Sequence, residues 1–105
     1  MVEVKWTVDA ISDLDGIALF IARDSPRNAQ NMVDRFFESA DLLVDQPLRG
    51  KPVRESNIPA VRELLVGSYR LIYLVVSEQR VDVLAIHHQK RRSPRPTVLK
   101  RLRKR

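Results

Sequence analysis

The first quarter of the chain changes from one hydrophobic period to another. Residues 2–8, VEVKWTV, carry an apolar side chain at every second position, and this period of two is typical of a half-buried strand. From Asp9 to about Arg23 the apolar residues recur at helical spacing instead. Asp9 is suited to cap that helix, because its carboxylate can accept hydrogen bonds from the free N–H groups of the first turn. The pattern therefore predicts a strand and then a helix.

The segment DSPR, residues 24–27, ends this helix and begins another. Asp24 or Ser25 can cap the second helix, and Pro26 fits its first turn, where the N–H that proline lacks has no partner. The apolar positions that follow are the most regular helical stripe in the chain: Ala29, Met32, Val33, Phe36, Phe37, Ala40 and Leu43. We interpret this stripe as packed core rather than as a ligand pocket. The two helices should form an antiparallel hairpin.

Prolines and glycine break any regular pattern over residues 46–59, and we interpret this stretch as a loop. Three strands are predicted after it, at residues 61–66, 69–76 and 80–87. The pair Gly67-Ser68 joins the first two of these strands in a two-residue hairpin. The middle strand is apolar or aromatic at nearly every position, so we expect it to be central in the sheet.

The predicted fold class is α+β, with elements in the order β-α-α-β-β-β. The helical hairpin should pack on a mostly antiparallel sheet. The basic C-terminus is expected to be a tail or a short helix built on Val98, Leu99 and Leu102. We expect residues 1–93 to form one domain and residues 94–105 to form a basic extension of it.

Composition limits the kinds of site and the location that we expect. The 105 residues include no cysteine, which excludes disulfides and thiolate metal sites. No stretch approaches the roughly 18 apolar residues of a membrane span, and the acidic start of the chain does not resemble a secretory leader. We therefore expect a soluble cytoplasmic protein that does not interact with membranes.

The net charge of +6 hides an uneven distribution. Residues 1–88 contain all thirteen acidic and ten of the nineteen basic residues, which gives −3. Residues 89–105 contain the other nine basic residues and no acid, which gives +9. Positive charge concentrated at one end suits a polyanion or an acidic protein partner, and the alternative is a solvated tail with no partner.

Four segments follow one another in a distinctive order. IARDSPRNA joins the predicted helices, PLRGKPV lies in the loop, VRELLVGSYRLIYLV forms the hairpin and IHHQKRR follows the last strand. With this order and spacing, residues 4–93 resemble the RelE/ParE superfamily of bacterial toxins, and they are closer to ParE and the plasmid-stabilisation proteins. The resemblance implies a toxin of a type II toxin–antitoxin module, neutralised in the cytoplasm by a cognate acidic antitoxin. ParE-like members poison DNA gyrase, whereas RelE-like members cut mRNA on the ribosome.

Cutting RNA without a metal requires a base, an acid and cations that bind the phosphate. Arg62, Arg70 and Arg91 are candidates for the cations. His87 and His88 are candidates for proton transfer because imidazole titrates near neutral pH, although neighbouring residues of a strand point to opposite faces. No further histidine or cysteine accompanies them, so we expect neither a metal site nor a cofactor.

Arg70 also has a purely structural interpretation. A charged residue in so apolar a strand needs a partner, and Glu63 on the neighbouring strand is the natural one for an ion pair. Arg62 and Glu63 point to opposite faces of a regular strand, so at most one of them can join Arg70.

The resemblance assigns roles to individual residues. In RelE-like ribonucleases the arginine of the Y-R pair and an arginine just after the last strand are functional, and these correspond to Arg70 and Arg91. Such enzymes carry lysines before the hairpin, where this chain has VRE at residues 61–63. Their late tyrosine falls near Thr97. These departures favour the ParE branch, which needs no catalytic constellation.

We therefore expect a non-enzymatic toxin that inhibits DNA gyrase. The first alternative is a ribosome-dependent mRNA endonuclease that uses Arg70 and Arg91 with His87 or His88. The second alternative is a general nucleic-acid-binding module. The residues expected to bind phosphate or a partner protein are Arg62, Lys90, Arg91, Arg92, Lys100 and Arg101. The sequence predicts no oligomeric state beyond a complex with the antitoxin.

Overall fold

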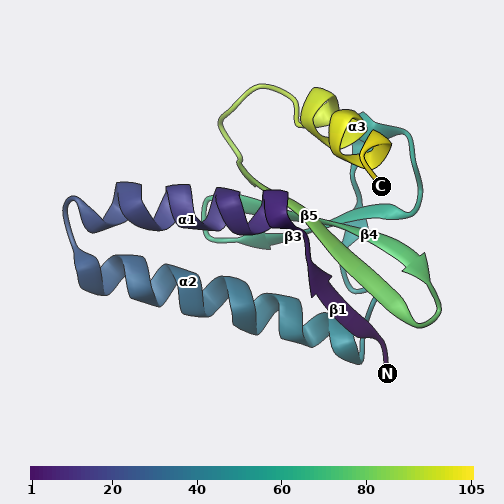
Figure 1. Cartoon of the computed structure of the whole chain (residues 1–105), viewed down its shortest axis with the longest axis horizontal. Helices are drawn as coiled ribbons and strands as arrows, with labels where there is room; N and C mark the ends of the chain where they lie inside the picture. The colour runs from purple at the N-terminus through teal and green to yellow at the C-terminus, as the bar shows by residue number, and fades with distance from the viewer.

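The structure, a computed structural model, describes residues 1–105 as one five-stranded sheet with helices against both faces (Figure 1). The strands are β1 (Glu3–Trp6), β2 (Lys51–Pro52), β3 (Val61–Val66), β4 (Tyr69–Ser77) and β5 (Arg80–His88). The helices are α1 (Val8–Ala22), α2 (Pro26–Asp41) and α3 (Arg95–Arg103), with short 3-10 helices η1 (Leu42–Val44) and η2 (Arg54–Ser56). The predicted α+β class and helical hairpin are confirmed. None of the helices combines the length and the apolar character needed to cross a membrane.

The strands lie side by side in the order β1-β5-β4-β3-β2. Only β1 runs parallel to its neighbour, β5, and the other three pairings are antiparallel. The predicted loop over residues 46–59 was wrong in part, because Lys51–Pro52 pairs with β3 as β2. Gly50 allows this close approach: a Cβ at this position would lie 2.4 Å from the carbonyl oxygen of Glu63.

The cap of α1 differs from the one that the sequence predicted. Thr7 rather than Asp9 is the N-cap, and its Oγ1 accepts a hydrogen bond from the backbone N–H of Ala10 at 3.2 Å. The same hydroxyl donates to the carbonyl oxygen of Val83 at 2.7 Å, so the cap also ties the helix to β5. Val8 was predicted to continue the alternation of the strand. It is instead the first residue of α1, and its side chain is exposed.

The second helix of the hairpin begins as the sequence predicted. Ser25 caps α2 by accepting a hydrogen bond from the N–H of Asn28 at 3.1 Å, and Pro26 lies in the first turn. The α-helix ends at Asp41, slightly before the predicted end, and the chain continues as η1. Leu43 is nevertheless fully buried, because the 3-10 turn keeps it on the side that packs against the sheet.

Each face of the sheet buries an apolar cluster of its own. The cluster under the α1–α2 hairpin includes Phe36, Leu43, Leu71, Tyr73, Val81 and Val83. The cluster under α3 contains Val53, Val61, Ile72, Leu84, Ala85 and Val98. Successive residues of β4 enter opposite clusters, since Leu71 and Tyr73 face the hairpin and Ile72 faces α3. The central strand is thus covered on both faces, as its apolar sequence predicted.

A bulge in β5 changes which of its residues face α3. Ile72 pairs with Ala85 but the next residue, Tyr73, pairs with Val83, which leaves Leu84 as an extra residue in β5. Leu84 and Ala85 therefore both enter the α3 cluster, although a regular strand would send them to opposite faces. Beyond the bulge, His87 lies opposite Arg70 and His88 lies opposite Tyr69.

The half of β5 beyond β1 has a free edge, because β1 pairs only with residues 80–83. Two charged side chains form hydrogen bonds with the backbone groups at this edge. Asp13 of α1 accepts a hydrogen bond from the N–H of Ile86 at 2.9 Å, and Arg101 of α3 donates to the carbonyl oxygen of Leu84 at 2.9 Å. Asp13 and Arg101 also bind each other in a two-pronged ion pair, with distances of 2.6 and 3.0 Å. This pair closes an edge that would otherwise be open to another strand.

Candidate functional site

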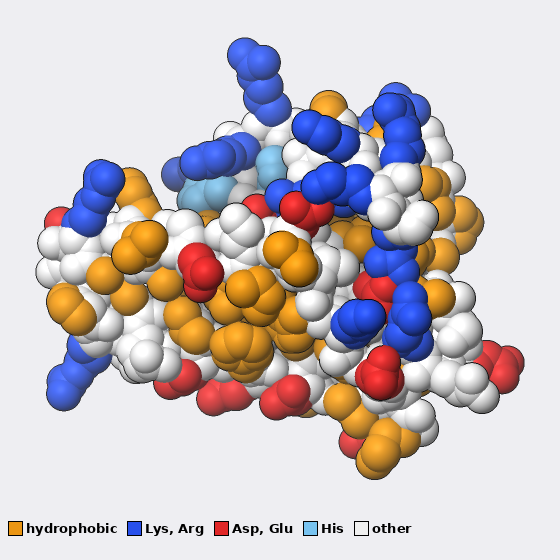
Figure 2. Space-filling view, viewed as in Figure 1, with side chains coloured by type: hydrophobic (Ala, Val, Ile, Leu, Met, Phe, Trp, Pro, Cys, Tyr) orange, Lys and Arg blue, Asp and Glu red, His pale blue; other side chains and the backbone are white.

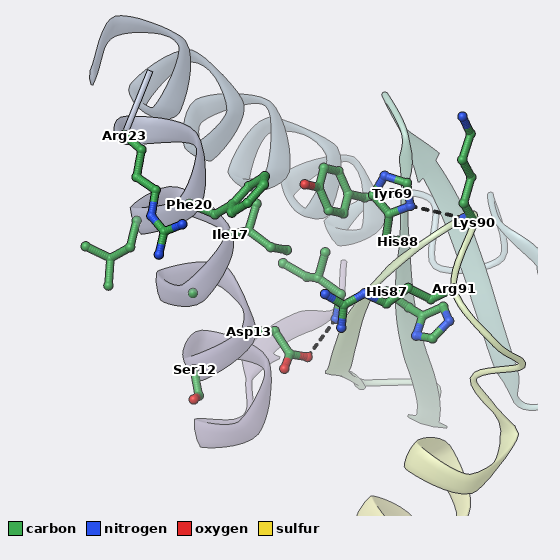
Figure 3. A pocket seen from close by; sticks show the side chains of 13 residues that line it. Ser12, Asp13, Ile17, Phe20, Arg23, Tyr69, His87, His88, Lys90 and Arg91 are labelled. Carbon is green, nitrogen blue, oxygen red and sulfur yellow. Dashed lines mark hydrogen bonds between the residues drawn. The ribbon is translucent and has the colours of Figure 1, made fainter. Parts of the chain in front are cut away.

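A groove of about 780 Å³ runs between α1 and the carboxyl end of β5 (Figure 3). Its apolar lining comes from Ile17, Leu19, Phe20, Tyr69 and Ile86. Its cations are Arg23 at the end of α1 and Lys90 and Arg91 in the turn after β5. Leu19 and Phe20 are 73% and 65% exposed. Exposed apolar side chains beside cations are typical of a surface that binds an acidic partner rather than of an enclosed substrate pocket.

Both histidines line this groove, although their side chains leave opposite faces of β5. They meet there because the groove follows the end of the strand. His88 lies edge-on to Tyr69 with ring centroids 5.1 Å apart, and its Nδ1 accepts a hydrogen bond from the backbone N–H of Lys90 at 3.1 Å (Figure 3). His87 Nε2 donates to the carbonyl oxygen of Arg92 at 2.6 Å. Each imidazole thus has one nitrogen engaged in shaping the turn after β5.

Arg70 lies outside the groove and is held between two carboxylates. Its Nε and Nη2 donate to Glu63 at 3.1 and 2.6 Å, and its Nη1 and Nη2 donate to Glu55 of η2 at 2.9 and 2.8 Å. These hydrogen bonds raise the pKa of Arg70, and the bond from Arg70 lowers the pKa of Glu55 to about 2. Four of the five N–H donors of this guanidinium are thus engaged by carboxylates. This leaves Arg70 little capacity to bind a phosphate.

The structure does not bring Arg70 and Arg91 together. Arg91 reaches from the turn after β5 into the groove, toward α1 (Figure 3). Arg70 is instead directed to Glu63 and Glu55. The two arginines that the resemblance to ribonucleases singles out therefore have separate surroundings.

Arg62, a third candidate for phosphate binding, supports the backbone of the loop before β2. Its Nη1 donates to the carbonyl oxygen of Gly50 at 2.6 Å. The N–H of the same glycine donates to the buried hydroxyl of Tyr73 at 2.9 Å. Burial raises the pKa of Tyr73, so this phenol remains protonated over the ordinary pH range.

The basic C-terminus divides into paired and unpaired cations. Arg101 binds Asp13 and Asp9, Lys104 binds Asp9 at 3.1 Å, and Arg105 binds the buried Asp82. The hydrogen bonds that Arg101 donates to Asp13 raise the pKa of Arg101. None of the other six basic residues after residue 88 forms an ion pair: Lys90, Arg91, Arg92, Arg95, Lys100 and Arg103. Arg101, a predicted partner-binding residue, is thus engaged inside the fold, and Lys100 is exposed.

Sequence reasoning missed the acidic residues that organise this arrangement. Glu55 was placed in a featureless loop, and Asp13 was only one of several polar residues on the first helix. One signal was available for Asp13: it follows Asp9 by four residues, so the two carboxylates lie on one face of the helix. Such an acidic face can attract a basic C-terminus. No group of three or more histidine or carboxylate side chains lies close enough to hold a metal ion.

Comparison with known proteins places this architecture in a family. Residues 4–93 match the family described as the ParE toxin of the type II toxin-antitoxin system parDE. The chain is 30% identical over 91 residues to the protein Y4kP of Sinorhizobium fredii, a match that covers 87% of this chain and 92% of that protein.

Two solved structures are similar. One is the chromosomal ParDE system from P. aeruginosa, with a TM-score of 0.68 and 26% identity over 84% of this chain and 96% of that one. The other is the toxin–antitoxin complex RelBE2 from Mycobacterium tuberculosis, with a TM-score of 0.54 and 29% identity over 83% of this chain and 96% of that one. The family match covers the hairpin, β2 to β5 and all of β1 but its first residue, and it ends just before α3. The chain belongs to the ParE toxin family of type II toxin–antitoxin systems.

Proposed function

We propose that this toxin acts by binding DNA gyrase, without cutting nucleic acid, and that a cognate acidic antitoxin neutralises it. The observation that carries the proposal is the environment of Arg70. Glu55 and Glu63 occupy this guanidinium with four hydrogen bonds of 2.6–3.1 Å. The arginine that a RelE-like nuclease would direct at phosphate is therefore part of the internal structure here. The ParE family description and the similarity to a ParDE structure support the same choice.

The groove between α1 and β5 is the surface that we assign to protein partners. Its exposed Leu19 and Phe20 can bury apolar area, and Lys90 and Arg91 beside them can pair with carboxylates. These properties suit an acidic, amphipathic segment of the antitoxin. The gyrase surface is expected to use at least the cationic side of the same groove, so that antitoxin and gyrase compete.

The test is a supercoiling assay with purified gyrase, relaxed plasmid and micromolar toxin. We expect loss of supercoiling and accumulation of cleaved DNA after the gyrase is digested. A Lys90→Gln/Arg91→Gln variant should require a higher toxin concentration. The matched control is Arg27→Gln/Arg35→Gln, which removes two exposed charges from α2. Unchanged supercoiling and no cleaved DNA with the wild-type toxin would refute the proposal.

A second candidate function, cleavage of mRNA, is favoured by one observation. His87 and His88 line one groove together with Lys90 and Arg91, and the Nε2 of His88 has no hydrogen-bond partner. The test is a translating extract with a labelled mRNA. Our proposal predicts that the mRNA stays intact. Cleavage that a His88→Ala variant loses would establish the nuclease instead.

A further inference from the structure

The outer side of α3 and the loop before it carry four exposed cations with no ionic partner: Arg92, Arg95, Lys100 and Arg103. Basic side chains gather around α3 in the space-filling view, with a few acidic side chains between them, and further acidic side chains lie along the lower edge and elsewhere on this face (Figure 2). No acidic residue occurs after residue 88. This group, which we call the α3 outer surface, therefore has a positive potential that nothing in the chain neutralises.

The α3 outer surface is held in a fixed place. Val98 is fully buried against the sheet, and Arg101 joins α3 to Asp13 of α1 and to the carbonyl oxygen of Leu84. Lys104 and Arg105 add ion pairs with Asp9 and Asp82. Arg95, Lys100 and Arg103 are thus presented from a folded helix and not from a flexible tail. Ordering them on a ligand therefore costs less entropy than ordering a disordered basic segment.

The chemistry of this surface excludes several kinds of partner. The apolar side of α3 is already packed on the sheet, so no apolar face remains to enter a membrane. The outward side has little apolar area, because only Pro96 and the partly buried Leu99 lie among the cations. A protein helix would find little to bury there. No tryptophan, tyrosine or phenylalanine occurs after Tyr73, and the cluster under α3 contains none, so this surface lacks the stacking platform that single-stranded nucleic acid requires.

A ligand that fits must offer regularly spaced negative charge without stacking or apolar burial. We propose that the α3 outer surface binds the phosphate backbone of duplex DNA, independently of sequence. Arg95 and Arg103 are eight residues apart on the helix, a rise of about 12 Å. Over that axial length one strand of B-DNA carries roughly three to four phosphates. The spacing therefore allows Arg95 and Arg103 to contact two phosphates of one strand that are roughly three to four steps apart.

Three of the four cations of the α3 outer surface lie beyond the region that matches the toxin family. The family match ends at residue 93, and α3 begins at Arg95. The groove assigned above to protein partners uses the neighbouring Lys90 and Arg91 but none of the four cations of the α3 outer surface. DNA binding here is thus an additional activity, and it does not depend on gyrase being the target.

The experiment measures binding of the full chain to a labelled 20-base-pair duplex by fluorescence anisotropy, at several salt concentrations and without gyrase. The test variant is Lys100→Gln/Arg103→Gln, and the control is Arg27→Gln/Arg35→Gln on α2. Both variants lose two charges, so the net charge of the protein falls equally. All four residues are exposed, and thermal unfolding checks that both variants stay folded. If the test variant is unfolded, Arg92→Gln/Arg95→Gln replaces it.

We expect the wild-type chain to bind the duplex at 50 mM salt and to lose affinity steeply as salt rises. In a plot of log affinity against log salt concentration, affinity falls with a negative slope. The test variant should make this slope less steep by about 1.8, roughly 0.9 for each phosphate contact removed. The control should keep the wild-type slope. The proposal is overturned if the wild-type chain does not bind, if both variants lower the slope equally, or if single-stranded DNA or RNA binds as tightly as the duplex.

Discussion

At the scale of single residues, Arg70 is held by two carboxylates inside the fold. It lies on β4 among apolar neighbours, and its charge is balanced by Glu63 from β3 and Glu55 from η2. Glu63 is only 5% exposed, so it has few waters to replace the guanidinium. The three side chains fasten η2, the segment between β2 and β3, to the centre of the sheet.

The substitution Arg70→Met should destabilise the protein by about 3 kcal/mol, because it leaves the buried Glu63 without a partner. Urea unfolding followed by circular dichroism measures the change. The double variant Arg70→Met/Glu63→Gln removes the orphaned charge and should recover at least half of the loss. Equal stability of the wild type and Arg70→Met would show that the ion pair contributes nothing to the fold.

Glu55 should make the stability of the protein depend on pH in the acid range. The hydrogen bond from Arg70 lowers the pKa of Glu55 from 4.5 to about 2 in the folded chain. Ionised Glu55 therefore stabilises the fold above about pH 4.5, and this contribution is lost as the pH falls toward 2. We expect about 1 kcal/mol, because the side chain is partly exposed. Urea unfolding from pH 2 to 6 should show a shallower decline for Glu55→Gln than for the wild type.

At the scale of the elements, the hydrophobic pattern predicted what depends on near neighbours and missed what depends on distant ones. The stripe from Ala29 to Leu43 and the turn at Gly67-Ser68 are local signals, and the structure has both α2 and the β3–β4 hairpin there. Nothing local shows that Lys51–Pro52 reaches β3, since that pairing depends on the missing side chain of Gly50. The bulge at Leu84 is likewise a result of how β5 meets β4.

In the candidate site, too, the sequence predicted a contact between neighbouring strands and missed contacts between distant segments. The contact between Arg70 and Glu63 could be predicted, because the two residues lie on strands that pair in a hairpin. The second carboxylate of Glu55 arrives through an irregular segment, and the partner of Arg101 is 88 residues away in the sequence. Contacts of this kind depend on the assembled fold, so they cannot be predicted from the spacing of residues along the chain.

The Asp13–Arg101 pair should be worth more than its partial exposure indicates, because it also satisfies the open edge of β5. The substitution Asp13→Ala leaves the N–H of Ile86 without its acceptor and frees Arg101. We expect a loss of about 2 kcal/mol in urea unfolding, together with faster amide exchange at Ile86. Asp15→Ala is the matched control, since Asp15 is an exposed acid of the same helix. If both substitutions have the same small effect, the edge is not held by this pair.

At the scale of the whole molecule, the sheet has two apolar faces and each needs a cover. The α1–α2 hairpin covers one face, and α3 covers the cluster that includes Ile72 and Leu84 on the other. The family match stops before α3, yet α3 also packs on the sheet, with Val98 fully buried. The C-terminal helix is therefore part of the folded unit as well as the carrier of unpaired charge.

A chain shortened to residues 1–93 should consequently lose stability as well as basic residues. Removing Val98 and Leu102 uncovers apolar area on the sheet, and at about 25 cal/mol per Å² the loss should be at least about 3 kcal/mol. That is a large share of the roughly 5–15 kcal/mol by which a domain of this size is stable. Urea unfolding and limited proteolysis should detect it. Val98→Ala is the control that keeps every charge, and it should reproduce about half of the loss. A truncated chain as stable as the full one would mean that α3 rests on the sheet without supporting it.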